Sequence, residues 1–410
     1  MSNNLTTLAR KSVFLAALIQ LVNAVDFMMI MPLGPDLARE LSISPTYIGY
    51  LGGGYTLAAA LSSLFTAKFI DNFDRKHVTI VALLGLTLST LLCGFAWDMQ
   101  SLIIARLFAG LFAGPATSIA LAIVTDQVPT AQRGRAMAIL MGAFSVAAIG
   151  GVPFGLKLAL WYSWSTPFFV VSLCGVITLI AVWALLPNMT HHLDDKNQRP
   201  QTGVSLLNLL GNPRVIYAFM SMGLAIFSTF LIVPNLATWL QYNLFVPRES
   251  MSEYYAVGGV ASLVVLQCGG RLTDKLGALK VTVVLALMIL FLLWDGFLHS
   301  PWLAPIAIFT LFMAFTATRT IAAAAVNTQV PQPGERAAFM SLQSVCQHTF
   351  SGLAAIVSSM ILVDHDGRLE NLTQLAGLSI LLTVIQPLFL YSLLKKIRIS
   401  ETLNVEAVSR

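Results

Sequence analysis

Apolar segments of about 20 residues recur along the whole chain, and they constrain its fold more than any other feature. A helix of about 20 apolar residues is long enough to cross the hydrocarbon core of a bilayer, which is about 30 Å thick. We assign twelve such segments, at residues 12–32, 45–67, 77–97, 101–124, 135–158, 164–187, 215–238, 252–269, 279–298, 302–325, 337–361 and 374–396. The runs are continuously apolar rather than alternating, so they predict helices and not the strands of a membrane barrel.

Composition leads to the same conclusion. Of the 410 residues, 57% are hydrophobic and 10% are charged. A soluble domain carries roughly 25% charged residues, so this chain has too few to cover a surface in contact with water. The sequence therefore predicts an all-α membrane protein with twelve transmembrane helices, in contact with the lipid bilayer along most of its length.

The basic residues follow the expected membrane topology. With the N-terminus placed in the cytoplasm and the sides alternated, 18 of the 24 Lys and Arg residues fall on the cytoplasmic side. This excess predicts a multi-pass plasma membrane protein with both termini in the cytoplasm, and in a bacterium the membrane would be the inner one. Because topology accounts for the basic charge, we expect no nucleic-acid partner. We expect the protein to be a monomer.

Little in the sequence points to a metal, a cofactor or a removable leader. The four cysteines lie inside predicted spans and are too scattered for a metal site. His191 and His192 lie in a polar stretch without further ligands beside them, which favours a solvated turn over a metal site. The first apolar run is too long for a cleavable signal peptide, and Pro32 and Pro35 follow it.

A polar stretch divides the chain into two similar halves. We assign residues 1–187 to a first six-helix bundle, 188–213 to a cytoplasmic linker, 214–398 to a second six-helix bundle and 399–410 to a cytoplasmic tail. The halves repeat each other weakly: Asp71 and Asp274 follow the second and eighth spans and lie 203 positions apart. Pro129 and Pro331 follow the fourth and tenth spans and lie 202 positions apart. Such internal repeats are typical of secondary transporters and predict two pseudo-symmetric bundles.

Four motifs in register with the spans resemble those of the major facilitator superfamily. Gly270, Asp274 and Gly277 are similar to the signature loop that follows the eighth helix of that family, and residues 67–76 form a less complete copy after the second helix. Residues 106–115 are similar to the fourth-helix motif. Residues 150–155 are similar to the fifth-helix motif of the antiporter branches, as in arabinose-efflux and drug:proton antiporter relatives. The resemblance covers nearly the whole chain and implies a major facilitator fold that moves small molecules.

One pair of opposite charges lies at membrane depth in the first half. Asp26 lies past the middle of the first span, and Gln20 and Asn23 share its helix face, because residues three apart are neighbours on a helix. Arg106, near the start of the fourth span, cannot lose its proton. A carboxylate at this depth needs a partner or water, so Asp26 and Arg106 predict a proton-coupling pair, and the resemblance implies a coupling role for Arg106 as well. The alternatives are a permanent structural ion pair and an arginine that reaches to the membrane surface.

Polar residues at depth in the second half predict part of a substrate site. Arg319 lies deep in the tenth span, whereas the acids in the second-half spans, Glu253 and Asp295, lie near the outer end. Arg319 is therefore expected to contact an anionic substrate group or a carboxylate across the cavity, with hydrogen bonding to carbonyls as the alternative. Gln347 and His348 lie on one polar face of the eleventh span. They are expected to line the cavity, with interhelical hydrogen bonding as the alternative and a proton on His348 as a further option.

Charged helix ends on the cytoplasmic side predict a latch between the halves. The residues assigned to this latch are Asp71, Arg75, Lys76, Arg271, Asp274 and Lys275. Opposite charges there can hold the halves together while the outer side is open, and the alternative is that they only set topology. In the fifth helix, Gly151 and Pro153 predict close packing and a kink that helps the halves to rock, with simple packing as the alternative.

Together these features predict a secondary transporter that exports a small organic molecule in exchange for protons by alternating access. The expected site combines Asp26 and Arg106 with Gln20, Asn23, Arg319, Gln347 and His348, and with apolar walls at Phe144, Phe227 and Phe230. Two deep arginines against one deep acid favour anionic or zwitterionic substrates. The main alternative is a symporter or uniporter for a metabolite or organic anion, and a weaker one is a non-transporting membrane sensor. The sequence shows no nucleophile set, metal cluster or nucleotide loop that would indicate an enzyme.

Overall fold

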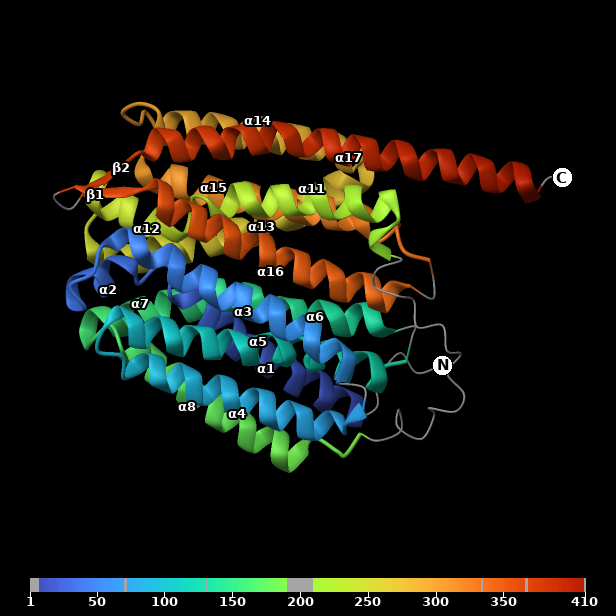
Figure 1. Cartoon of the computed structure of the whole chain (residues 1–410), viewed down its shortest axis with the longest axis horizontal. Coiled ribbons are helices and arrows are strands. Elements are labelled where there is room, and N and C mark those ends of the chain that lie inside the picture. The colour runs from blue at the N-terminus through green and yellow to red at the C-terminus, as the bar shows by residue number, and fades with distance from the viewer. Residues whose placement is uncertain are drawn as a thin grey trace.

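Two groups of long helices, one from each half of the chain, lie side by side (Figure 1). The computed structural model describes residues 7–69, 72–129, 132–189, 209–332, 335–365 and 368–408. The long helices of the first half are α1 (Thr7–Met29), α3 (Ile48–Phe69), α4 (Arg75–Gly94), α5 (Met99–Gln127), α6 (Arg133–Val146) with α7 (Val152–Trp161), and α8 (Thr166–Leu185). Those of the second half are α11 (Pro213–Phe230), α13 (Met251–Leu276), α14 (Ala278–Phe297), α15 (Pro305–Asn327), α16 (Arg336–Ile361) and α17 (Leu372–Val408).

The same helix pairings recur in the two halves. α1 packs against α5 and α6, and at the equivalent place α11 packs against α15 and α16. In the same way α3 packs against α5 and α4 against α8, while α13 packs against α15 and α14 against α17. The predicted fold class, twelve helices in two pseudo-symmetric bundles, is confirmed.

Judged by length and hydropathy alone, ten of the helical segments among the described residues could cross a membrane. The other two are α3, with 22 residues that include four glycines and two serines, and α16, with 26 residues that include five serines and two glutamines. These two helices pack against each other across the boundary between the halves. Their small and polar residues therefore contact protein where the other spans contact lipid, which explains their lower hydropathy.

Several helices begin at the capping residues that the sequence offers. The Asp74 side chain accepts a hydrogen bond from the backbone of Lys76 at the start of α4. Asp98 and Ser101 cap each other at the start of α5, and the hydrogen bonds from Ser101 lower the pKa of the Asp98 carboxyl. Asn212 caps α11, whose first residue is a proline that needs no backbone donor.

Two predicted spans are interrupted, each next to a proline. The fifth span consists of α6, a π-helical turn at Ala147–Gly151 and α7, so the regular pattern breaks just before Pro153. In the seventh span α11 ends at Phe230, and Pro234 lies in a short 3₁₀ turn that follows. In both places proline lacks the backbone N–H that a continuous α-helix requires.

The structure also contains a small element that the sequence did not predict. Strands β1 (Val363–His365) and β2 (Arg368–Glu370) form an antiparallel hairpin between α16 and α17. Asn243 holds this hairpin by donating a hydrogen bond of 2.9 Å to the carbonyl of Leu369 and accepting one of 3.2 Å from its N–H. Most of the predicted linker, 188–213, lies outside the described residues, and α17 continues to Val408, into the predicted tail.

Helix α1 begins and helix α17 ends at the same end of the molecule, which we call the proximal end; the opposite one is the distal end (Figure 1). The two halves are packed tightly in the distal half of the molecule. A Cβ placed on Gly53 of α3 would come within 2.8 Å of the carbonyl oxygen of Gly352 in α16. One placed on Gly259 of α13 would lie 3.0 Å from the carbonyl oxygen of Ala148. Glycine at these positions lets backbones of different halves touch.

Candidate functional site

Asp26 of α1 and Arg106 of α5 form an ion pair inside the first bundle. The Nη1 atom of Arg106 lies 3.2 Å from Oδ1 and 3.1 Å from Oδ2 of the carboxylate. Both side chains are fully buried. Thr90 of α4 donates a third hydrogen bond of 2.8 Å to Oδ1. The predicted partnership of Asp26 and Arg106 is therefore present, and each charge satisfies the other at a depth where neither could stand alone.

A tyrosine from α3 completes this cluster. The guanidinium carbon of Arg106 lies 4.3 Å from the centre of the Tyr55 ring, within the range of a cation–π interaction. The Tyr55 hydroxyl donates a hydrogen bond of 2.8 Å to Asn23, whose amide donates one of 2.7 Å to Thr117. A Cβ on Gly110 would collide with the backbone of Tyr55, so this glycine lets α3 approach α5 closely.

The sequence predicted only part of this network. Asn23 and Asp26 share a face of α1 as expected and meet through Tyr55 and Arg106. Gln20 lies on the same face and is fully buried, but its amide atoms make no hydrogen bond within the described chain. Sequence reasoning missed Tyr55, although an aromatic hydroxyl directly after three glycines in an apolar span was a usable signal.

The charges in this cluster depend on one another. Protonation of Asp26 would remove the negative charge that faces Arg106, and the guanidinium would keep only the tyrosine ring as a neighbour of complementary charge. The Nε and Nη2 atoms of Arg106 are buried and have no oxygen partner within the described part of the chain, although the Cys93 thiol lies beside the guanidinium. These spare donors are suited to a carbonyl or carboxylate oxygen of a ligand.

Arg319 is hydrogen-bonded to neutral groups of the protein, which is the alternative that the sequence left open for it. Its Nη2 donates to the carbonyl of Ala225 at 3.0 Å, to Ser228 at 2.7 Å and to Thr229 at 3.3 Å, and its Nη1 donates to Thr383 at 3.2 Å. The side chain is fully buried between α15, α11 and α17. All these acceptors are neutral and belong to the second bundle. The geometry favours the structural alternative over a substrate contact.

We expect the Arg319→Ala variant to be less stable than the parent, because the change leaves a cavity and removes the donor shared by α11 and α17. The free energy of unfolding is expected to fall by about 1–3 kcal/mol. It should fall less in Arg319→Lys, because lysine keeps the charge. Thermal unfolding in detergent measures this effect. A variant of parental stability that binds ligand more weakly by calorimetry would instead identify Arg319 as a substrate contact.

The predicted aromatic walls are only partly assembled. Phe230 stacks with Phe27 of the other half at a ring-centre distance of 6.3 Å, and these two residues lie 203 positions apart in the internal repeat. Phe227 makes an edge contact with Phe350 at the same distance. Phe144 lies on α6 with 38% of its surface exposed, and no ring contact joins it to these residues within the described chain.

The other predicted site residues lie on α16. Gln347 approaches the sulfur of Met222 at 3.5 Å, across to α11. His348 is half-buried, and its backbone carbonyl accepts a hydrogen bond from Ser351. These contacts fit interhelical packing as well as a cavity wall, so the assignment of both residues to the substrate site stays a prediction.

The described residues predicted to form the cytoplasmic latch lie at helix ends in both halves, and the latch itself stays a prediction. Arg75 pairs with Asp126 at 3.1 Å inside the first half, and Lys76 is half-buried at the start of α4. On the other half Arg271, Asp274 and Lys275 are exposed at the end of α13. Asp71 lies outside the described residues.

Gly151 and Pro153 pack at the break in the fifth span. A Cβ on Gly151 would lie 2.6 Å from a methyl group of Val25 in α1. The carbonyl of Pro153 accepts a hydrogen bond of 2.9 Å from Ser252 in the other half. The motif therefore connects both bundles as well as interrupting a helix.

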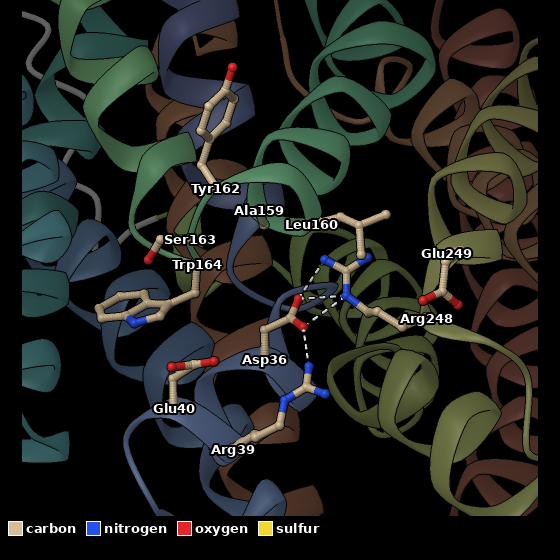
Figure 2. A pocket seen from close by; sticks show the side chains of 10 residues that line it. All are labelled: Asp36, Arg39, Glu40, Ala159, Leu160, Tyr162, Ser163, Trp164, Arg248 and Glu249. Atoms are coloured by element: carbon tan, nitrogen blue, oxygen red, sulfur yellow. Dashed lines mark hydrogen bonds and ion pairs between the residues drawn. The ribbon is translucent and has the colours of Figure 1, made fainter.

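A pocket opens at the distal end, away from the Asp26 cluster, and both halves contribute to it (Figure 2). Its lining residues are Asp36, Arg39, Glu40, Ala159, Leu160, Tyr162, Ser163, Trp164, Arg248 and Glu249. Asp36 lies at its centre between Arg39 and Arg248 (Figure 2). This charged arrangement was not predicted from the sequence.

Known proteins resemble this chain in sequence. It is 26% identical over 269 residues to YceJ, an uncharacterized MFS-type transporter of Bacillus subtilis. The match covers 65% of this chain and 67% of the relative. The chain is 28% identical over 284 residues to the class B tetracycline resistance protein of Escherichia coli, covering 66% and 68%. It is 28% identical over 206 residues to the purine ribonucleoside efflux pump NepI of Salmonella paratyphi A, covering 50% and 49%. The matched segments thus span between one half and two thirds of these relatives.

Solved structures resemble it over nearly its full length. A bacterial homolog of the human lysosomal transporter Spinster, in an inward-facing and unoccupied conformation, matches with a TM-score of 0.77, 16% identity and coverage of 95% of this chain and 98% of that one. A D-xylose–proton symporter matches with a TM-score of 0.72, 14% identity and coverage of 92% and 97%. At these identities the likeness establishes the fold alone.

The sequence profile of the Major Facilitator Superfamily matches residues 16–358, most of the chain. The relatives are transporters and not enzymes, as the sequence predicted. With the twelve-helix fold and the motifs described above, this match shows that the chain belongs to the Major Facilitator Superfamily.

Proposed function

We propose that the protein is a proton-coupled antiporter that exports a small organic molecule. The observation that carries the proposal is the fully buried pair of Asp26 and Arg106, supported by Thr90 and Tyr55. A buried carboxylate beside a fixed positive charge has two states of different net charge, and a ligand can favour one of them. Two relatives named as an efflux pump and a resistance protein support the direction of transport.

The proposed cycle uses the two charge states in turn. With Asp26 ionised, as its pairing with Arg106 implies, the inward-facing transporter takes up substrate. Protonation of Asp26 from the outer side removes the charged acceptor that the carboxylate offers to donor groups of the substrate, so the substrate leaves. Return to the inward-facing state releases the proton and re-forms the pair. The substrate and the proton therefore occupy the site alternately.

The charges and the packing support one orientation in the membrane. The positive-inside distribution supports a proximal end that faces the cytoplasm, with both termini there. The closed packing at the distal end then supports an inward-facing conformation, and the similarity to an inward-facing structure is in accord with it. The domain boundaries and the monomeric state stay predictions.

The geometry changes the expected substrate class. Both deep arginines are engaged within the protein, one with Asp26 and the other with neutral acceptors. The spare donors of Arg106 still favour a ligand with carbonyl or carboxylate oxygens, and the stacked Phe27 and Phe230 favour an aromatic one. We therefore propose a neutral or zwitterionic molecule that carries a ring and donor groups for the Asp26 carboxylate, not a lone cation.

Proton movement in proteoliposomes tests this function. A thermal-shift screen that includes purine ribonucleosides and tetracycline, the ligands in the names of two relatives, first identifies a binder. Vesicles loaded with the binder and with a pH-sensitive dye are then diluted into binder-free buffer. Antiport predicts that the lumen becomes acidic as the binder leaves. A lumen that becomes alkaline would show symport, and an unchanged pH during flux would show uniport.

We also expect the charged residues at the proximal end to hold the two halves together there when the distal end opens. Asp274→Ala should shift the conformational equilibrium toward a more open proximal end, because the outward-facing state would lose a contact between the halves. Spin-label distances across that end, measured with bound ligand, check this result. Lys280→Ala serves as a control at a nearby exposed charge outside the signature loop. Equal distances in Asp274→Ala and the parent would leave these loops with a role in topology only.

A further inference from the structure

An ion pair joins the two halves at the distal surface. Asp36 belongs to α2 (Gly34–Glu40) of the first half, and Arg248 belongs to the loop before α13 in the second half. Nε of Arg248 lies 2.8 Å from both carboxylate oxygens, and its Nη2 lies 2.6 Å from Oδ2. The two side chains are only 10% and 9% exposed. This pair is thus largely screened from water, unlike an ordinary surface salt bridge.

Arg248 has a second partner in the first half. Its Nη2 also donates a hydrogen bond of 3.2 Å to the carbonyl of Leu156 in α7. The guanidinium of Arg248, in the second half, therefore contacts two segments of the first half. These are α2, which follows the first span, and α7, which ends the fifth. Two further hydrogen bonds join the halves nearby. The Ser252 hydroxyl donates to the carbonyl of Pro153 at 2.9 Å, and the Tyr242 hydroxyl donates to the carbonyl of Pro35 at 3.4 Å.

We propose that Arg248 is the residue that holds the distal gate of this transporter closed, with Asp36 as its main partner. When the halves part at this end, Arg248 must leave both Asp36 and Leu156 together, because these belong to one half and Arg248 to the other. Separation exposes the carboxylate and the guanidinium to water, which compensates for part of the lost contact. The bridge therefore makes the inward-facing state a distinct minimum, not a point on a continuous motion.

The chain contains a matched control for this proposal. Arg39 also contacts Asp36, at 2.9 Å, but it lies three residues further along the same short helix and its side chain is 63% exposed. Loss of Arg39 removes a positive charge from the same carboxylate without cutting a link between the halves. If charge balance at Asp36 were the only role of these arginines, the two losses would act alike.

The proposal rests on family membership and not on proton coupling, so it is tested without substrate. Nitroxide labels at positions 97 and 300, exposed and equivalent in the internal repeat, report the distance across the distal end. The four native cysteines are first replaced, and the background is kept only if it unfolds at the parental temperature. Electron–electron double resonance then compares Arg248→Gln, Asp36→Asn, the double variant and Arg39→Gln.

We expect the ratio of open to closed distal ends to rise about tenfold in Arg248→Gln. Asp36→Asn should have a similar effect, and the double variant should add little, because the two residues act through one contact. Arg39→Gln should stay near the parent. Equal distance distributions in Arg248→Gln and the parent would overturn the proposal, and so would equal shifts in Arg39→Gln and Arg248→Gln. A variant that fails to fold is replaced by Arg248→Lys, which keeps the charge but cannot span both partners and should give a smaller shift in the same direction.

Discussion

Replacement of Asp26 by asparagine is expected to abolish transport driven by a pH gradient. Asparagine is nearly isosteric and can still accept the hydrogen bond from Thr90, but it has no proton to exchange between the two sides. It also leaves Arg106 buried without a counter-charge, at a cost of about 3–5 kcal/mol in stability. Asp26→Glu restores a carboxyl group and should recover part of the coupling. The measurement is substrate accumulation in proteoliposomes under an imposed pH gradient.

Asp295→Asn is the matched control for this variant. Asp295 is also a fully buried aspartate, but its carboxylate accepts hydrogen bonds from the backbone N–H groups of Trp302 and Leu303 near the end of α14. Its neutral variant keeps one accepting oxygen, and so one of these two hydrogen bonds, and should keep gradient-driven transport. If Asp26→Asn transports at the parental rate, or if Asp295→Asn loses coupling to the same extent, Asp26 does not carry the proton.

The second large effect is expected from added methyl groups between α3 and α16. Gly49 would clash with Ala355 if it carried a Cβ, and Gly53 with Gly352 and Ile356. Each clash arises only when the distal end is closed, and overpacking of this kind costs about 1–3 kcal/mol. The Gly49→Ala/Gly53→Ala variant should therefore lower the closed population about tenfold or more and slow transport by a similar factor.

Gly54→Ala is the control that separates the clash between α3 and α16 from any effect of alanine on helix α3 itself. Gly54 is adjacent to Gly53 but points into its own half, where a Cβ would make an ordinary contact of 3.4 Å with Leu107. Alanine also favours helix over glycine, so this variant should be as stable as the parent or more so. Distances between labels at positions 97 and 300 report the conformational shift. If the Gly54 variant and the double variant shift equally, the α3–α16 contact does not control closure.

The spans and the repeat could be predicted because each depends on local sequence. A run of about 20 apolar residues dictates a membrane helix wherever it occurs, and the paired motifs around Asp71 and Asp274 reveal the duplication. Gly150, Gly151 and Pro153 likewise indicated the break in the fifth helix, although not its π-helical form. Asp26 and Arg106 could be paired because few other charges lie at that depth.

Side-chain direction could not be predicted in the same way. Arg319 was expected to face a central cavity, but its guanidinium turns toward Ser228 and Thr383, and which neighbouring helix it meets depends on packing between segments far apart in sequence. The distal bridge of Asp36 and Arg248 joins residues separated by 212 positions, one in the short helix α2 and one in the turn before α13. Both segments are too short for a periodic pattern, so the sequence offers charges there without indicating which of them meet.

Proton release on ligand binding tests the central claim most directly. The purified protein in weakly buffered detergent solution is mixed with a saturating amount of the binder found in the thermal-shift screen, and a pH indicator reports the protons released. If substrate and proton compete through Asp26, the parent should release up to one proton per ligand bound, the number falling as the starting pH rises and the carboxyl is already ionised. Asp26→Asn should bind ligand and release none. Equal proton release from the parent and from Asp26→Asn at every pH would contradict the account.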